Sequence, residues 1–261
     1  MKQKNSGVFQ KPVLKISGIA LGMAFILISH TGVCQNIEVN SKKGSLLGWW
    51  QFDEAAGSKI QDSSSQSNHG VMAENSGCRT NGRIGGGLAA KEILKVNAAN
   101  ITLGADTMER LRMSSEITLE LWIKWEASSE GSGCSAVYGC PRLWIYGDGR
   151  LLFAIGPITA ANHEESNNFL ISRRILKKDV WHHIACVFNK GTMFIYIDGE
   201  MDVSKKTPNK PAFRSEMAFG GFKGTLDEAR LYSRALGAEE VKRHAVLDES
   251  MRWEYIEDQQ K

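Results

Sequence analysis

The sequence predicts an all-β fold, a two-sheet antiparallel sandwich of the jelly-roll type with one short C-terminal helix. Short runs rich in β-branched and aromatic residues recur along the chain, and glycine, asparagine and aspartate separate them. Only one stretch, near the C-terminus, has the composition of a helix. Because many short strands with little helix are typical of antiparallel sandwiches and barrels, we expect two stacked sheets over one core.

Alternation of apolar and polar residues supports this fold class most clearly in 117–125, ITLELWIKW. The odd-numbered residues from Ile117 to Trp125 share one face, and Trp122 shares the other with Thr118, Glu120 and Lys124. The other expected strands are 46–52, 92–97, 142–147, 150–156, 181–188, 192–197 and 224–232.

The stretch 181–200, WHHIACVFNKGTMFIYIDGE, is interpreted as two strands and two turns and not as a metal site. Successive side chains of a strand point to opposite faces, so His182 and His183 cannot share one metal ion unless the backbone bulges. Asn189-Lys190-Gly191 suits a short turn, and Asp198-Gly199 is a strong turn signal. We therefore expect the two histidines to be packed side chains of the framework.

The expected helix is 237–247, GAEEVKRHAVL. Acidic residues stand in its first turn and basic residues follow, as the helix dipole favours. Gly237 is an acceptable but weak N-cap.

The first 34 residues have the pattern of a secretory signal peptide. Four lysines precede an apolar stretch, 16–28, that is too short to span a bilayer comfortably, and small residues follow at Gly32 and Cys34. We expect a secreted, periplasmic or cell-surface protein with these parts: signal peptide 1–34, N-terminal linker 35–45, jelly-roll domain 46–247 and C-terminal tail 248–261.

A second interpretation of the leader makes Cys34 the acylated cysteine of a lipoprotein. Val33 is large where a lipobox has a small residue, so we favour simple secretion, with a mature chain that starts at Gln35.

Removal of the leader changes the charge, because 1–34 carries four lysines and no acid. The net charge of +3 for the whole chain becomes −1 for the mature chain. A nearly neutral chain without a basic run lacks the electrostatic footprint of a nucleic-acid-binding or membrane-surface protein. We expect neither partner, and no membrane span after cleavage.

Four cysteines remain after cleavage, an even number that permits disulfides in an exported chain. Cys134 and Cys140 flank SAVYG, and their short separation makes them the expected bridge. Cys186 stands between apolar residues and is interpreted as a buried thiol. Cys78 could pair with it or not. The cysteine spacing gives no CxxC pair and no support for a zinc knuckle.

Five stretches taken in order give the chain its resemblance to a known family. They are WWQFDEAAGSKIQDSSSQSNHG (49–70), GGGLAAKEILKVN (85–97), ITLELWIKW (117–125), WHHIACVFNKGTMFIYIDGE (181–200) and FKGTLDEARLYSRALGAEEV (222–241). In this order the chain resembles the LamG-like jelly-roll domains of bacterial secreted proteins, which are laminin G-like members of the concanavalin A-like superfamily. The resemblance implies two stacked antiparallel sheets, with the histidine strand as framework. Gly237, where the family usually has a serine cap, and Cys134 and Cys140, in a region commonly free of cysteine, depart from the pattern.

The acidic residues do not form the pattern of a glycan-cleaving enzyme. Such an enzyme holds two carboxylates across the scissile bond. Asp227 and Glu228 are adjacent, as are Asp53 and Glu54, so the members of each pair are expected to face opposite sides of a strand. The sequence also has no nucleophile elbow, no HExxH and no P-loop. We expect no catalytic residues.

Asp227 is a candidate calcium ligand. The alternation in 224–232 places it with Ala229 and Leu231 and predicts that it is partly buried, where a carboxylate needs hydrogen bonds or a cation. The oxygen-rich loop QDSSSQSNHG offers Asp62 and Asn68 as further ligands. The resemblance implies the same ion, since laminin G-like domains often hold calcium. The alternative is that Asp227 accepts backbone N–H groups or meets an arginine.

Three functions remain open for the chain. The first is a secreted, non-catalytic binding module for carbohydrate or a cell-surface polymer. The second is a structural or adhesive domain with a protein partner, and the third is a diverged glycan hydrolase. The ligand-binding residues of a glycan site would include an exposed aromatic platform, which the sequence does not identify.

Overall fold

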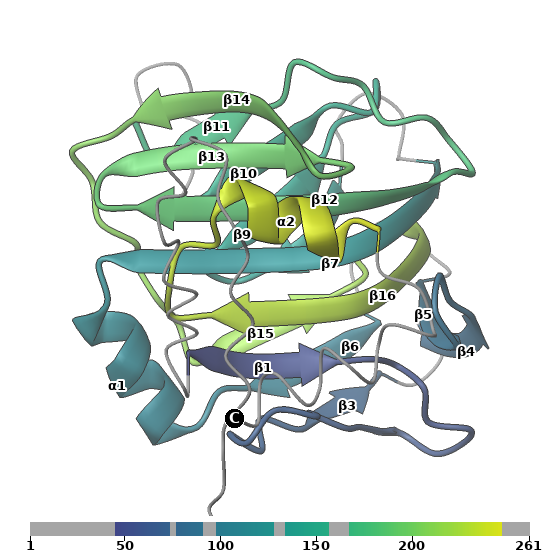
Figure 1. Ribbon diagram of the computed structural model, residues 1–261. Coiled ribbons are helices and arrows are strands. Elements are labelled where there is room, and N and C mark those ends of the chain that lie inside the picture. The colour runs from purple at the N-terminus through teal and green to yellow at the C-terminus, as the bar shows by residue number, and fades with distance from the viewer. Residues whose placement is uncertain (1–44, 74–76, 91–97, 128–133, 157–166, 247–261) are drawn as a thin grey trace, which may run out of the picture. The chain divides into compact units, whose positions relative to one another are not determined.

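Strand β7 (Glu116–Ala127) forms the centre of sheet A, the larger layer of the molecule (Figure 1). The structure is a computed structural model that describes residues 45–73, 77–90, 98–127, 134–156 and 167–246. Neighbouring strands of sheet A are antiparallel, in the order β14 (Glu200–Lys206), β13 (Thr192–Ile197), β12 (Trp181–Asn189), β7, β16 (Lys223–Tyr232), β5 (Gly86–Ala90) and β4 (Gly77–Asn81), and β1 (Leu46–Trp50) also pairs with β16.

Sheet B is the second antiparallel layer. Its strands follow the order β11 (Phe169–Ile171), β10 (Leu151–Ala154), β9 (Arg142–Ile145), β8 (Cys134–Tyr138), β15 (Glu216–Phe219), β6 (Ala99–Thr102), β3 (Gly70–Met72) and β2 (Lys59–Ile60). The predicted all-β sandwich of two antiparallel sheets is confirmed.

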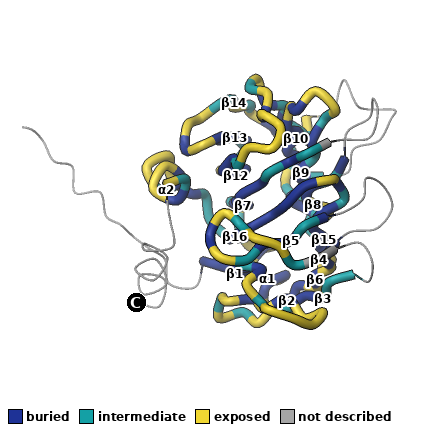
Figure 2. The backbone as a smooth tube through the Cα atoms, turned by 90° about the vertical axis from the view of Figure 1, so that its right-hand side faces the viewer, coloured by how far each residue is buried: buried dark blue, intermediate teal, exposed yellow. Residues whose placement is uncertain are grey.

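The main core lies between the two sheets. One face of β7 supplies Ile117, Leu119, Leu121 and Ile123, as the alternation predicts, and sheet B contributes Leu143, Phe153 and Phe219. Figure 2 shows these central strands as mostly buried and the connecting segments as mostly exposed. Each large apolar side chain that is removed from water contributes about 1.5–3 kcal/mol, so this core is the main stabilising feature of the fold.

The outer face of sheet A, which points away from sheet B, has an apolar cluster of its own. Trp49, Tyr196 and Tyr232 belong to it, together with Val241 of helix α2 (Ala238–His244). Figure 1 shows α2 in front of the central strands of sheet A. The helix therefore covers the part of this face on which buried polar residues gather.

Both helices are short, and only α2 matches a sequence prediction. It begins after Gly237, whose backbone N–H donates to Glu240 Oε2 at 3.3 Å. Helix α1 (Ala105–Met113) was not predicted, although Met108 and Leu111 have helical spacing and both are buried. Its N-cap is Gly104, which has no side chain to accept a hydrogen bond, so the usual start signal is missing.

Several predictions fall on residues outside the described part. These are the signal peptide 1–34, the linker 35–45 except Ser45, the strand 92–97 and the tail 248–261. The described residues belong to the unit Ser41–Lys261. In that described part, neither helix has the length or the apolar character that a membrane crossing needs.

The predicted bridge between Cys134 and Cys140 does not form in the structure, where both residues are free and buried. Cys134 begins β8, which runs to Tyr138, and an extended strand of five residues covers roughly 13 Å, whereas the Cα atoms of a disulfide are about 6 Å apart. Cys140 Sγ instead donates to the Ile155 carbonyl at 3.1 Å. Burial raises the pKa of both thiols to about 12, so both stay protonated and unreactive near neutral pH.

Candidate functional site

Glu120, in the middle of β7, is the centre of a buried polar network under α2. Its carboxylate accepts hydrogen bonds from Tyr232 Oη at 2.9 Å, His244 Nδ1 at 3.0 Å and Arg230 Nη1 at 3.3 Å. Burial opposes ionisation, but these cationic and histidine neighbours hold the pKa of Glu120 well below its usual range. The carboxylate is therefore charged and fully used as an acceptor.

Glu228 extends the same network along β16. Its Oε2 accepts from Trp49 Nε1 at 2.8 Å and from Arg230 Nη2 at 2.5 Å. Arg230 thus joins Glu228 to Glu120, and all three side chains are inaccessible to solvent. Two carboxylates that share a buried guanidinium cannot act as acid and base on an external glycosidic bond, so the arrangement is structural.

The paired histidines have separate partners, as the strand period predicts. His182 Nδ1 lies 2.8 Å from Asp198 Oδ2, and the His182 ring also accepts the Lys177 N–H at 3.2 Å. His183 lies on the outer face, edge-on to Trp122 at a centroid distance of 5.3 Å. Trp122 is buried, so it is part of the framework and not an exposed platform.

The alternation expected for Asp227 and Glu228 is wrong, because β16 contains a bulge. Glu228 has a positive φ of 51°, and the register with β7 shifts between Asp227 and Arg230. Ala229 consequently belongs to the main core, while Asp227 lies opposite Trp122. The bulge turns both acidic side chains away from the interior between the sheets.

Asp227 is buried, and its carboxylate accepts backbone N–H groups. Oδ2 accepts from Arg83 and Ile84 at 2.8 Å each, and Oδ1 accepts from Glu228 at 2.7 Å. The chain comes so close at Gly82 that a Cβ there would lie 2.6 Å from Oδ2. Burial and the Glu228 carboxylate raise the pKa of Asp227 to about 8, against the opposite effect of the N–H donors.

The three calcium candidates do not form one ligand set. Asp62 Oδ2 accepts the Asn68 N–H at 2.8 Å, and Asp62 Oδ1 accepts the N–H groups of Trp49 and Ser64, each at 2.8 Å. Asp227 is held instead by the 83–84 turn. N–H donors already occupy the positions around these carboxylates, so the residues do not fit a calcium ion. Over the described ranges, no group of three histidine, cysteine or acidic residues is placed to hold a metal.

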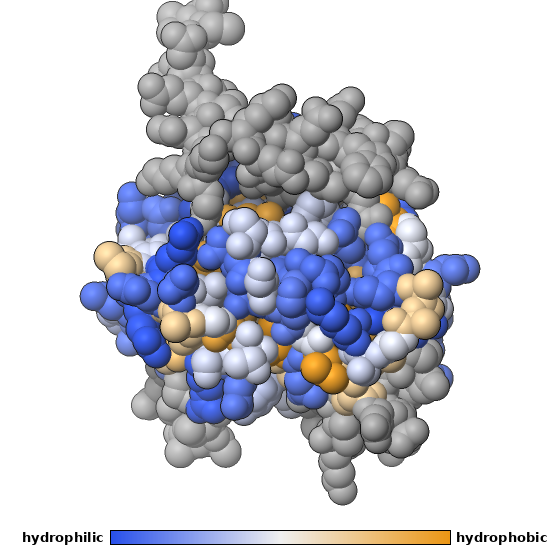
Figure 3. All heavy atoms as spheres, turned by 90° about the horizontal axis from the view of Figure 1, so that it is seen from below, coloured by the Kyte–Doolittle hydropathy of each residue, from blue (hydrophilic) through white to orange (hydrophobic). Residues whose placement is uncertain are grey.

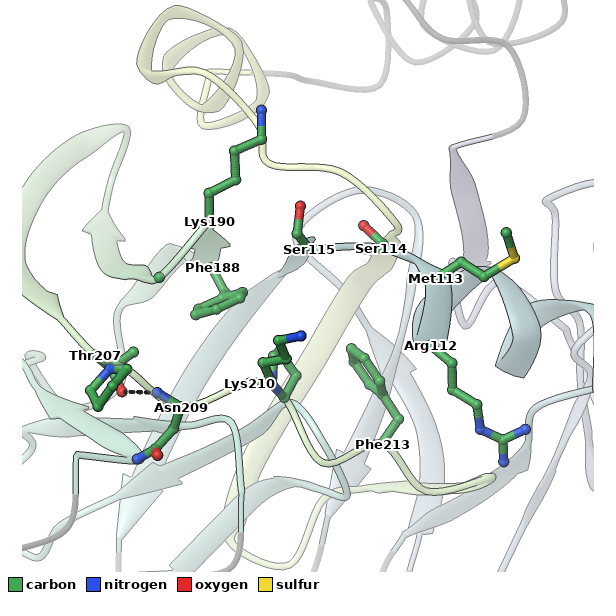
Figure 4. Close-up of a pocket in the computed structure, with 13 residues that line it drawn as sticks. Arg112, Met113, Ser114, Ser115, Phe188, Lys190, Thr207, Asn209, Lys210 and Phe213 are labelled. Carbon is green, nitrogen blue, oxygen red and sulfur yellow. Dashed lines mark hydrogen bonds between the residues drawn. The ribbon is translucent and has the colours of Figure 1, made fainter.

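A groove of about 400 Å³ lies at one end of the sandwich, where three chain segments meet (Figure 4). They are 112–115 at the end of α1, the β12–β13 turn 188–191, and 207–213. The Lys190 N–H donates to the Ser115 carbonyl at 3.0 Å, and the Thr207 N–H donates to the Gly191 carbonyl at 2.8 Å. The segments are thereby fixed to one another, and the volume falls in the range of small-molecule sites, about 300–1,000 Å³.

The groove combines aromatic rings with polar and cationic groups. Phe188 belongs to the main core, and the half-buried Phe213 packs against that core. Core side chains therefore hold both rings in place. Figure 4 shows the Lys210 side chain between these two rings, and Asn209 beside Thr207. Lys190 extends from the turn, and Arg112 lies at the α1 edge.

None of these groove residues was predicted as a binding residue. They come from segments far apart in the sequence, and no spacing rule brings Phe188 and Phe213 together. One local signal is present in Lys190-Gly191, because the first position of a two-residue hairpin turn usually has asparagine, aspartate or glycine.

Elsewhere on the described surface, large exposed apolar side chains lie mainly on separate elements, such as Val71 of β3, Ile175 before β12 and Met201 of β14. On the face in Figure 3, hydrophilic residues predominate and the hydrophobic ones are scattered. This face of the described residues is thus predominantly polar.

Solved structures with the same fold include binding domains of botulinum neurotoxins and of a mosquitocidal protein. The binding domain of botulinum neurotoxin DC, in complex with rat synaptotagmin II, has a TM-score of 0.58 and 14% identity, over 77% of this chain and 51% of that one. The binding domain of Paraclostridial Mosquitocidal Protein 1 has a TM-score of 0.60 and 16% identity, over 78% and 52%. A botulinum neurotoxin type C structure, described by its dependence on two ganglioside molecules for cell entry, has a TM-score of 0.58 and 14% identity, over 77% and 51%.

The chain spans about half the length of these structures, and identities this low show a common fold alone. No curated protein matches the sequence. A family model described as the concanavalin A-like lectin/glucanases superfamily matches residues 96–242, more than half of the chain. With the two-sheet sandwich and the framework motifs in place, this match shows that the chain belongs to the concanavalin A-like lectin/glucanases superfamily, as a laminin G-like member.

Proposed function

We propose that this protein is an exported, non-catalytic binding module that recognises carbohydrate through the groove formed by 112–115, 188–191 and 207–213. The groove itself is the observation that carries the proposal. It offers ring surface from Phe213 beside the amide of Asn209 and the hydroxyl group of Ser115. Sugar rings have apolar C–H faces and polar edges, and sites for such ligands combine aromatic side chains with a few directed polar groups.

The acids support binding without turnover. No carboxylate lines the groove, and Glu120, Glu228 and Asp227 are all buried and hydrogen-bonded elsewhere. Glycoside hydrolysis needs two carboxyl groups that reach one substrate bond. The leader 1–34 is consistent with export to a location where polysaccharides are available.

The toxin domains with this sandwich support the proposal of a binding role. One of them is described with gangliosides and another in complex with rat synaptotagmin II. A protein partner is therefore the alternative outcome of the test. A glycan is the favoured ligand, because the large apolar side chains exposed among the described residues lie mainly on separate elements, whereas a protein interface would usually gather them in one patch.

The experiment applies one panel of purified polysaccharides in two assays with the full chain. Equilibrium binding measures recognition, and release of reducing sugar from the same polymers measures turnover. Saturable binding without sugar release, weakened by Phe213→Ala, is the expected result. Sugar release that a single acid-to-amide substitution abolishes would establish the hydrolase. Absence of binding to every polysaccharide would refute the carbohydrate proposal and direct the search to a protein partner.

A further inference from the structure

We infer that the saccharide unit bound in the groove is anionic and carries a carboxylate or sulfate group that Lys190 and Lys210 recognise, with Arg112 at the edge. This inference rests on the proposed function and narrows it to acidic polysaccharides. The lining of the groove contains these three cationic side chains and no acidic one.

Two of the three cations have no counterion in the described part of the chain. No described carboxylate lies within ion-pair distance of Lys210 or Arg112. Lys190 Nζ lies 3.3 Å from Glu116 Oε1, but Lys190 is largely exposed, and Glu116 also accepts the Ala235 N–H through its other oxygen. Exposed pairs of this kind contribute little to stability, so a ligand anion can compete for the lysine.

The backbone at Lys190 gives an independent argument. Asn189 and Thr192 are paired, so Lys190 and Gly191 form a two-residue turn, and their φ angles are 43° and 88°. Such a turn needs positive φ at both positions, which asparagine and glycine tolerate much better than lysine does. A disfavoured residue at such a position indicates that its side chain is needed there.

Backbone hydrogen bonds fix the segments that carry these cations before a ligand arrives. Hydrogen bonds join the turn to Ser115 and to Thr207, and the Ala212 N–H donates to the Ile155 carbonyl at 2.7 Å. A preorganised site loses less conformational freedom on binding, which raises affinity. Lys210, between the rings of Phe188 and Phe213, can contact an acidic substituent while the half-buried Phe213 ring contacts the sugar (Figure 4).

A sugar acid explains the groove better than a nucleic acid does. Only three cationic residues line the groove, and the chain without its leader has a net charge of −1. Nucleic-acid-binding surfaces carry basic residues over a wide face and give the domain a strongly basic character. A single-stranded DNA oligomer is therefore the competing anion in the test.

The experiment is a set of equilibrium titrations of the full chain with oligogalacturonide, a heparin-derived oligosaccharide, a neutral cello-oligosaccharide and a single-stranded DNA oligomer. The variants are Lys190→Asn and Lys210→Gln. Lys177→Gln is the matched control, since Lys177 precedes β12 and lies at the end of that strand opposite to Lys190. Comparison of the uronate with the sulfated sugar shows which acid group is preferred.

The wild type should bind at least one acidic sugar more tightly than the neutral one, and added salt should weaken that binding. Each groove variant should weaken acidic-sugar binding about tenfold, the loss expected for one charged hydrogen bond. Lys177→Gln should change it less than about twofold. Lys190→Asn should not lower the melting temperature, because asparagine suits the turn, so weaker binding cannot be attributed to unfolding.

Equal affinity for neutral and acidic sugars, unchanged by both groove variants, would overturn this inference and leave the carbohydrate function standing. Tighter binding to DNA than to any sugar would also overturn it. Failure of every saccharide to bind would instead refute the proposed function.

Discussion

Glu120 and His244 are joined by a hydrogen bond of 3.0 Å that connects the centre of β7 to the last residue of α2. The two residues are 124 positions apart in the sequence, and both are buried. Glu120 also holds Arg230 and Tyr232, so one ionised carboxylate organises the outer face of sheet A. Glu228 joins this network through Arg230, so both carboxylates are engaged within the protein.

Glu120→Gln should destabilise the protein strongly. The substitution removes the charge from the acceptor that Arg230, Tyr232 and His244 share, while Arg230 keeps Glu228 as a counterion. Each hydrogen bond to a charged group contributes about 1.5–3 kcal/mol. Urea unfolding measures the loss. Glu109→Gln, at an exposed position of α1, is the control and should change the free energy of unfolding by less than about 0.5 kcal/mol. Similar effects of the two substitutions would show that the network is not a stabilising centre.

His183 should make the protein less stable in mild acid. Burial lowers the pKa of His183, and its ring nitrogens have no hydrogen-bond partner among the described residues, the closest carboxylate oxygen being Glu120 Oε2 at 3.6 Å. The folded state therefore prefers the neutral ring, while the unfolded chain binds a proton below about pH 6.5. The stability that the neutral His183 ring contributes is present above that pH and is lost as the pH falls toward the pKa of His183 in the folded state.

Chemical unfolding at a series of pH values tests this contribution. His183→Gln should flatten the pH dependence just below pH 6.5, a window that follows from the reference histidine pKa. Glu120 affects the free energy of unfolding at lower pH. Its pKa is depressed in the folded state, so the stability that its carboxylate contributes is lost only below about pH 4.5, as the pH falls through the folded pKa. An unchanged slope in His183→Gln would contradict the assignment.

Asp227 should have the opposite dependence on pH. Its pKa is raised to about 8, so its stabilising contribution is complete below the unfolded pKa of about 3.9 and is lost as the pH rises through the folded value. The free-energy difference between wild type and Asp227→Asn should therefore shrink as the pH rises from about 4 to about 8. A difference that stays constant over this range would show that Asp227 is ionised throughout.

Calcium should not change the melting temperature. The carboxylates of Asp62 and Asp227 accept N–H groups, and an ion that does not bind the native state cannot stabilise it by mass action. Thermal unfolding with added calcium and with EDTA provides the test. A rise with calcium that EDTA reverses, and that Asp62→Asn abolishes, would restore the calcium site that the sequence suggested.

Strict alternation made much of the fold predictable from sequence. The two faces of β7 and β12 follow from it, since Ile184 and Cys186 lie in the main core and Ala185 and Val187 on the outer face. The hairpin turn at Lys190-Gly191 follows from turn chemistry. The bulge at Glu228 breaks the alternation, and a residue with positive φ that is not glycine gives no sequence signal.

The groove was not predictable, because its chemistry depends on tertiary structure. Phe213 lies in the segment after β14, and Arg112 lies in α1, a helix without a capping side chain. Only the two sheets bring these residues together with Lys190. The predicted cysteine bridge failed for a related reason, since closeness in sequence does not give closeness in space when the intervening residues form a strand.

The most direct test of the groove as the binding site is backbone amide chemical-shift mapping of the full chain titrated with oligogalacturonide. We expect the largest shifts at Lys190, Gly191 and the non-proline residues of 207–213, and we expect them to disappear in the Lys190→Asn, Lys210→Gln double variant. Large shifts confined to the outer face of sheet A, with the amides of the groove unchanged, would contradict this expectation.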